Sequence, residues 1–214
     1  MRLLLDLKVK KSSILLAVYL FSMFLPGFFS NQVMQIVSNI MMVGVAIYLF
    51  SVKYKPSRFM ILTICYFAYL IVITFIYHNK AADIHLIISN LKIVFMLCAI
   101  EYLLKRTPHS TINIMFFILI TFVIIDFASI VLFPNGLYQT EQIWNEWSSS
   151  QEAQWIYGNK NNRVYWYALL SIITWLRYFF NNKSKVMVLI TSGISIVAMM
   201  LVKSSTATIV AILV

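Results

Sequence analysis

Charged residues are scarce in this chain, and acidic residues are the scarcest of them. Only 11% of its 214 residues are charged, and just seven are Asp or Glu, whereas charged residues make up about a quarter of a soluble domain. Hydrophobic residues account for 61%. The shortage of charge therefore argues against an ordinary soluble domain.

Signatures of metal binding and nucleotide chemistry are also missing. The two cysteines, Cys65 and Cys98, lie inside apolar stretches, where a buried free thiol is the usual state. The three histidines are scattered, without the spacing of a metal site. The sequence has no Walker loop, dinucleotide fingerprint or HExxH motif, which argues against a nucleotide-driven pump and a zinc protease. We therefore expect no metal and no cofactor.

What the chain has in abundance is long apolar blocks. Each is roughly 16 to 22 residues long, enough for a helix to cross about 30 Å of hydrocarbon. The blocks cover approximately 14–29, 33–52, 59–77, 84–104, 112–133, 164–180 and 186–202, and another begins near Thr206. The sequence predicts an all-α, polytopic helical integral membrane protein with about seven to eight transmembrane helices, forming a single helical domain over residues 1–214. The first block lacks a small-residue cleavage site, so we interpret it as an uncleaved helix.

The distribution of Lys and Arg predicts the orientation. The N-terminus carries four of them, and the turns at 53–58, 105–110 and 177–185 carry three, two and three. The intervening segments hold only Lys80, Lys160, Arg163 and Lys203. Because cytoplasmic segments are enriched in cations, we expect the N-terminus inside and the interval 134–163 outside. The net charge of +10 is then a topology signal, and nucleic acid is not expected as a partner.

Two ionisable residues, Lys92 and Asp126, lie within the apolar blocks. Both are expected roughly 10–12 Å below the outer surface, a depth at which charged groups are functional candidates. One interpretation is that the two residues form a buried pair. The other is that Lys92 faces a cavity beneath the outer interval and contacts an anionic substrate.

The interval 134–163 is the longest polar stretch and is predicted to be an extracytoplasmic loop. Ile143, Trp144 and Trp147 share one face of a short helical period, which suits a membrane interface. Alternatively, the aromatic rings stack on sugars while Glu146 or Glu152 hydrogen-bonds hydroxyls or removes a proton. The residue types fit both interpretations.

The end of this interval, Gly158-Asn159-Lys160-Asn161-Asn162-Arg163, leads into an apolar helix. Gly158 permits unusual backbone angles, and Asn159 or Asn161 can cap the helix. Lys160 and Arg163 add positive charge at the positive end of the helix dipole, which favours an anion. The pattern predicts a pyrophosphate site or, more simply, a helix cap with interfacial cations.

A second polar patch, Lys203-Ser204-Ser205-Thr206, separates the last two apolar blocks. Its predicted topology places it on the same outer side. One cation and three hydroxyls there suit phosphate oxygens, although a polar hairpin explains the pattern equally well.

These elements together resemble the bacterial superfamily that contains the Wzy-type repeat-unit polymerases of O-antigen and capsule and the O-antigen ligases. Members often show a Gly-x-x-Asn element leading into a helix, one further span, and then a Ser-Arg-Thr-type element. Gly158-Asn159-Lys160-Asn161 matches the first, and Ser204-Ser205-Thr206-Ala207 stands at the second. Ser205 occupies the place where members often carry arginine, which moves the expected phosphate contact to Lys203. The match covers about residues 155–214; the first 133 residues are similar only in topology and composition.

The resemblance implies glycosyl transfer at the outer face of the bacterial cytoplasmic membrane. A glycan on undecaprenyl pyrophosphate would pass to a hydroxyl of another lipid-linked repeat unit. The residues expected to contact the substrate and its pyrophosphate are Gly158, Asn159, Lys160, Asn161, Arg163, Lys203, Ser205, Thr206 and Lys92. Cations would hold the leaving group, and Glu146 or Glu152 would act as the base. Other capsule or O-antigen assembly proteins are expected as further partners.

The sequence stops at Val214, about nine residues into an apolar run that is too short to span a membrane. Members of the superfamily continue into a large outer loop and further spans. We therefore expect the sequence to be a fragment or the product of a truncated reading frame. The alternatives to a polymerase are a ligase of the same superfamily, a flippase-like transporter of lipid-linked sugars, and an inactive remnant.

Overall fold

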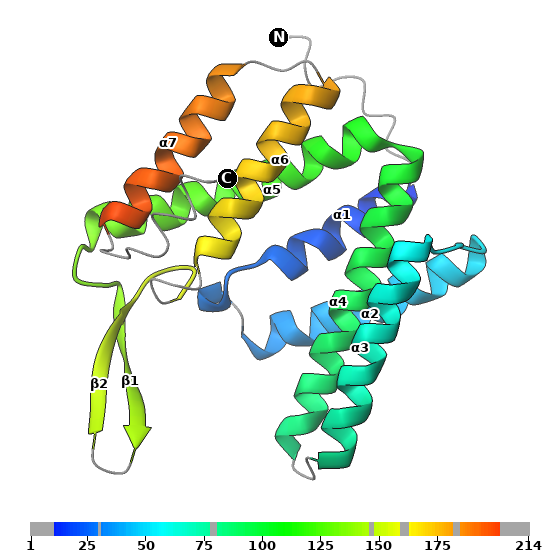
Figure 1. The fold of residues 1–214 in the computed structure, drawn as a ribbon, viewed down its shortest axis with the longest axis horizontal. Helices are drawn as coiled ribbons and strands as arrows, with labels where there is room; N and C mark the ends of the chain where they lie inside the picture. The colour runs from blue at the N-terminus through cyan, green and yellow to red at the C-terminus, as the bar shows by residue number, and fades with distance from the viewer. Residues whose placement is uncertain are drawn as a thin grey trace. The chain divides into compact units, whose positions relative to one another are not determined.

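The computed structural model describes residues 11–29, 31–77, 81–145, 148–158, 163–181 and 185–201. Within them lie seven α-helices and one β-hairpin (Figure 1). The chain divides into two compact units: unit 1 comprises Met1–Met23 and Asn31–Thr111, and unit 2 comprises Phe24–Ser30 and Ile112–Val214.

Unit 1 is built from four helices, and the apolar blocks predicted the last three of them closely. The four helices are α1 (Lys11–Phe24), α2 (Gln32–Ser51), α3 (Arg58–Tyr77) and α4 (Ala81–Arg106). Asn31 caps α2 by accepting a hydrogen bond from the Met34 N–H at 2.9 Å. Helix α4 packs against both α2 and α3, and α3 and α4 run side by side (Figure 1).

The first helix is shorter than predicted. The apolar block covers 14–29, but α1 ends at Phe24 and a 3-10 turn, Gly27–Phe29, follows. Pro26 explains the difference, because proline disfavours helical angles in the residue before it. At about 1.5 Å per residue, α1 is roughly 21 Å long, less than the hydrocarbon thickness.

Unit 2 contains α5 (Pro108–Leu132, whose first residues belong to unit 1), the hairpin, α6 (Arg163–Asn181) and α7 (Lys185–Leu201). Helix α6 is tied to α5 by side-chain hydrogen bonds, one of which runs from Arg177 Nε to Asn113 Oδ1 at 2.8 Å. Helix α7 packs against α6. Unit 2 thus brings the end of the polar interval back against α5.

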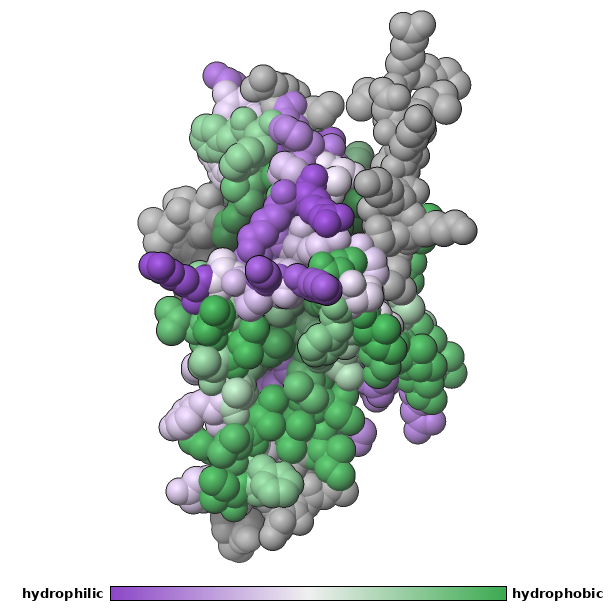
Figure 2. All heavy atoms as spheres, turned by 90° about the vertical axis from the view of Figure 1, so that its right-hand side faces the viewer, coloured by the Kyte–Doolittle hydropathy of each residue, from purple (hydrophilic) through white to green (hydrophobic). Residues whose placement is uncertain are grey.

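Four helices in the described residues are long and apolar enough to cross a membrane: Gln32–Ser51, Arg58–Tyr77, Ile84–Arg106 and Pro108–Leu132. Large apolar side chains are widely exposed on them, such as Phe50 at 79% and Phe75 at 75%. Figure 2 shows a broad hydrophobic surface below a band of hydrophilic side chains. Exposure of this kind is unusual in a soluble monomer and is consistent with a multi-pass membrane protein.

The expected short helical period around Trp144 is wrong. Residues Tyr138–Asn145 (β1) and Ser148–Gln154 (β2) form an antiparallel hairpin, with Tyr138 opposite Gln154 and a bulge between Ile143 and Asn145 (Figure 1). A segment this short is a poor isolated helix, whereas two strands satisfy each other's backbone groups. Thr, Ile, Trp and Tyr in β1 also favour a strand.

We predict that Gly136→Ala destabilises the base of this hairpin. Gly136 has φ +100°, and a Cβ there would lie 2.9 Å from Ala153 Cβ. The variant should lose about 1–3 kcal/mol of unfolding free energy because both the backbone angle and the contact are unfavourable. Ala153→Gly in the same chain should restore part of the loss but not all, since the backbone angle stays strained. The unfolding free energies of the single and the double variant are measured in detergent micelles. A Gly136→Ala chain as stable as the unmodified one would contradict the geometry.

Candidate functional site

The candidate site is organised around Asp126, a carboxylate with no exposed surface in the apolar helix α5. Asp126 lies six residues before the end of α5 at Leu132. Its backbone carbonyl accepts a hydrogen bond from the Ser129 hydroxyl at 2.7 Å. An ionised carboxylate is costly to bury without partners. The surrounding residues must therefore supply donors and positive charge.

Both carboxylate oxygens of Asp126 have partners from later in the chain. The Tyr157 N–H donates to Oδ1 at 3.0 Å, and the Tyr167 hydroxyl donates to Oδ2 at 2.9 Å. Arg163 Nη1 lies 3.8 Å from Oδ2. One loop residue and two α6 residues therefore converge on a single side chain of α5.

The loop reaches Asp126 through a tight turn from Trp155 to Gly158. The backbones of these two residues hydrogen-bond reciprocally, at 2.9 and 3.0 Å. The turn needs glycine at its end, because Gly158 has φ +88°. The Trp155 indole N–H donates to the Phe133 carbonyl at 2.8 Å, which fastens the turn to the end of α5.

Arg163 connects this turn to the start of α6. Its guanidinium is fully buried, lies over the Trp155 ring at 4.5 Å, and donates from Nη2 to the Gly158 carbonyl at 3.2 Å. The planar guanidinium suits this combination of stacking and hydrogen bonding better than a lysine would. The segment between Gly158 and Arg163 is consequently held at both ends.

Some polar groups in the site have unused hydrogen-bonding capacity. Among the described residues, Arg163 Nε and Nη1 and the Tyr157 hydroxyl have no hydrogen-bond partner. Burial and, secondly, the Asp126 charge raise the pKa of the Tyr157 hydroxyl well above its usual value, so this hydroxyl stays protonated. Its ring stacks on Trp166 at 5.1 Å. The arrangement combines a fixed cation with donors beside the start of a helix.

The structure brings together two of the predicted site residues, Gly158 and Arg163. The backbone of Glu152 lies opposite that of Thr140 in the hairpin. Lys92 belongs to unit 1, where its carbonyl accepts a hydrogen bond from the Tyr19 hydroxyl at 2.8 Å. The remaining candidates lie outside the described residues: Glu146, Asn159, Lys160, Asn161, Lys203, Ser205 and Thr206.

One of the two interpretations from the sequence paired Asp126 with Lys92, which belongs to the other unit. Within unit 2, the cation beside Asp126 is Arg163. Sequence reasoning also missed Tyr157 and Tyr167. Tyr167 was detectable, because it lies four residues after Arg163 and therefore on the same helix face. Tyr157 was not, because it contributes a backbone N–H whose direction depends on the turn.

Within the part of the chain that the structure describes, no three His, Cys, Asp or Glu residues gather as metal ligands would. The donors around Asp126 suit an anion or a carboxylate rather than a metal ion. Comparison with protein-family models, curated proteins and solved structures finds no match for the chain.

We predict that Asp126→Ala costs about 3–5 kcal/mol of unfolding free energy, because it leaves the buried Arg163 without its counter-ion. Combining it with Arg163→Met should cost less than the two single changes added together. Lys105→Ala is the matched control: its ion pair with Glu101 is half exposed on the lysine side, and such pairs contribute at most about 1 kcal/mol. Unfolding in mixed micelles measures all four variants. Additive losses for Asp126 and Arg163 would contradict their coupling.

Proposed function

We propose that this chain is a multi-pass protein of the bacterial cytoplasmic membrane, with its N-terminus inside, that takes part in glycosyl transfer at the outer face. Its substrate is a glycan carried on undecaprenyl pyrophosphate, and the product is a longer capsule or O-antigen chain. The bilayer itself and other glycan-assembly proteins are the further partners. The Lys and Arg distribution and the four long apolar helices support the orientation and the location.

The observation that carries the proposal is the anchoring of the segment from Gly158 to Arg163. Gly158 is fixed by the turn, Arg163 is fixed by Asp126, and the two are joined by a hydrogen bond. The sequence between them, Asn159 to Asn162, contains Lys160 and immediately precedes α6. A lysine that directly precedes a helix in the sequence would add positive charge near the helix N-terminus, where a phosphate group is favoured.

The roles of the residues follow from the chemistry. The acceptor hydroxyl oxygen attacks the anomeric carbon, the bond from that carbon to pyrophosphate breaks, and the hydroxyl proton passes to a base. Lys160 and Lys203, with Ser205 and Thr206, would stabilise the charge that grows on the departing pyrophosphate. Glu146 and Glu152 are the candidate bases.

Arg163 has a different role in this proposal from the one that its charge alone suggested. Its guanidinium is fully buried and already engaged with Asp126, Trp155 and Gly158. We therefore assign it as a positioning residue that fixes the preceding segment, and we assign direct contact with pyrophosphate to Lys160.

A gene deletion tests the reaction class. Loss of long surface glycan, with single lipid-linked repeat units accumulating at the outer face, is the result expected for a polymerase. Accumulation of long chains still on the lipid carrier would indicate a ligase, and accumulation at the inner face would indicate a flippase. An unchanged glycan profile would overturn the proposal in favour of an inactive remnant.

We predict that Lys160→Ala slows elongation about 100- to 1,000-fold, the range seen when one stabilising group at a developing charge is removed. The assay uses the purified chain in vesicles with repeat units extracted from the deletion cells. Lys105→Ala, on the predicted cytoplasmic side, should elongate at the normal rate. Equal rates for Lys160→Ala and the unmodified chain would remove Lys160 from the site.

A further inference from the structure

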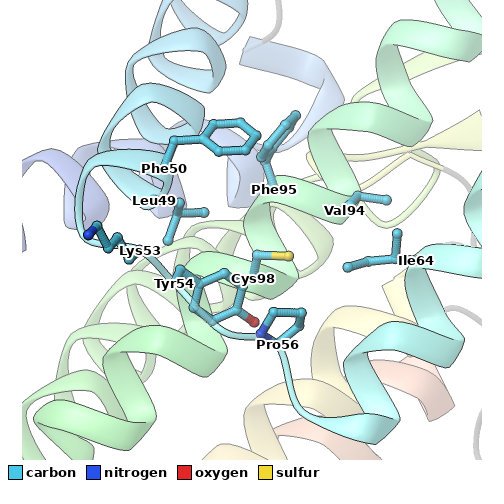
Figure 3. A pocket seen from close by; sticks show the side chains of 9 residues that line it. All are labelled: Leu49, Phe50, Lys53, Tyr54, Pro56, Ile64, Val94, Phe95 and Cys98. Atoms are coloured by element: carbon cyan, nitrogen blue, oxygen red, sulfur yellow. The ribbon is translucent and has the colours of Figure 1, made fainter.

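Unit 1 contains a cavity of about 330 Å³ where the turn between α2 and α3 meets α4 (Figure 3). The turn holds Lys53 in a left-handed conformation, with φ +50°. The cavity is lined by Leu49, Phe50, Lys53, Tyr54, Pro56, Ile64, Val94, Phe95 and Cys98. All of these residues belong to unit 1, whereas Asp126 belongs to unit 2.

The lining selects an apolar occupant. Phe50 and Phe95 face each other at one end, and the Cys98 thiol points into the space (Figure 3). Lys53 contributes its aliphatic stem while its Nζ points away from the cavity (Figure 3), as expected of a long cationic side chain at an interface. A polar solute would find few partners inside, whereas a hydrocarbon chain would be well accommodated.

The hydroxyl of Tyr54, one of the lining residues, is already engaged. The Tyr54 hydroxyl donates to the Glu101 carboxylate, which also accepts the Ser57 N–H at 3.1 Å. Burial, and secondly this hydrogen bond, raise the pKa of Tyr54, so the hydroxyl remains a donor. Lys105 pairs with Glu101 at 2.7 Å and reaches the Lys55 carbonyl at 3.3 Å. This network fastens the turn to α4.

Cations are frequent on the turn that lines one side of the cavity. Lys53, Lys55 and Arg58 are exposed, and none has an ion-pair partner among the described residues. Arg106, also exposed, lies over the Tyr102 ring at 5.0 Å. Positive charge therefore lies beside an apolar cavity at the ends of α2 and α3, two of the helices able to span a membrane.

We propose that this cavity binds an anionic phospholipid of the surrounding bilayer, with a segment of one acyl chain inside and the phosphate held by Lys53, Lys55 and Arg58. Basic pockets between helices on the cytoplasmic side recognise anionic head groups in this way. The volume is at the low end of the range for ligand pockets, so it admits part of one chain rather than a whole lipid. The site relies on the proposed orientation but not on glycosyl transfer.

Native mass spectrometry of the purified full chain tests the lipid site. Phosphatidylglycerol should bind more tightly than phosphatidylcholine, which has no net charge, and more tightly than diacylglycerol, which has no phosphate. Reversing two cations with Lys53→Glu and Lys55→Glu should weaken phosphatidylglycerol binding at least about tenfold, because each cation near an anionic lipid contributes substantially. Lys185→Glu, a charge reversal in unit 2, should leave binding unchanged.

A second variant tests the cavity itself. Val94→Phe fills the space and should weaken phosphatidylglycerol binding, whereas Leu62→Phe on the exposed surface of α3 should not; helical circular dichroism confirms that both fold. Binding that is insensitive to Val94→Phe and to the two charge reversals would overturn the proposal. Competition by inorganic phosphate at millimolar concentration would also overturn it, because the site would then recognise free phosphate rather than a lipid.

Discussion

The burial of one carboxylate in an apolar helix is the constraint on which unit 2 depends. Asp126 has no exposed surface, and α5 supplies no cation to neutralise it in the described structure. Asp126 is instead stabilised by the backbone N–H of Tyr157, the hydroxyl of Tyr167 and the guanidinium of Arg163. Because a buried charge left unpaired is strongly destabilising, these contacts fix where the loop ends and α6 begins. The candidate site is a consequence of that arrangement.

The two units place different chemistry at their polar ends. In unit 2 the buried ion pair fixes Arg163 at the start of α6, and the tight turn from Trp155 ends at Gly158. In unit 1 the Glu101 network supports a turn with exposed cations beside an apolar cavity. By the proposed orientation, the first faces the outside and the second the cytoplasm. Each would recognise a phosphate-bearing lipid, the first as substrate and the second as a component of the bilayer.

The sequence predicted the helices well because their signal is local. Long apolar runs can satisfy their backbone groups in hydrocarbon only as helices, so the block 33–52 became Gln32–Ser51 and the block 112–133 became Pro108–Leu132. The early end of the first helix could also have been predicted, because Pro26 is visible in the sequence. Gly158 and Arg163 were also recognised as related, since only a short polar segment separates them.

The remaining features depend on contacts between residues far apart in sequence. Lys92 was a candidate partner for Asp126 because the two residues were expected at the same depth. In unit 2, the cation beside Asp126 is Arg163, 37 positions later in the chain. The turn at Trp155–Gly158 folds the chain back and brings Arg163 there. The spacing of Ile143, Trp144 and Trp147 fitted a helical face, yet the first two lie in Tyr138–Asn145, which pairs as a strand with Ser148–Gln154. Trp147 lies outside the described residues. The same turn buries Arg163. Its charge alone did not predict this burial, which changes its proposed role from phosphate contact to positioning.

The most direct test of the account is the side of the membrane on which the anchored segment lies. Single cysteines are introduced by Asn161→Cys or Lys55→Cys in a chain carrying Cys65→Ala and Cys98→Ala, and intact cells are treated with a membrane-impermeant maleimide. The account predicts that the Asn161→Cys chain is labelled in intact cells and that the Lys55→Cys chain is labelled only after permeabilisation. The reverse pattern would place the segment from Gly158 to Arg163 in the cytoplasm and contradict an outer-face glycosyl transfer.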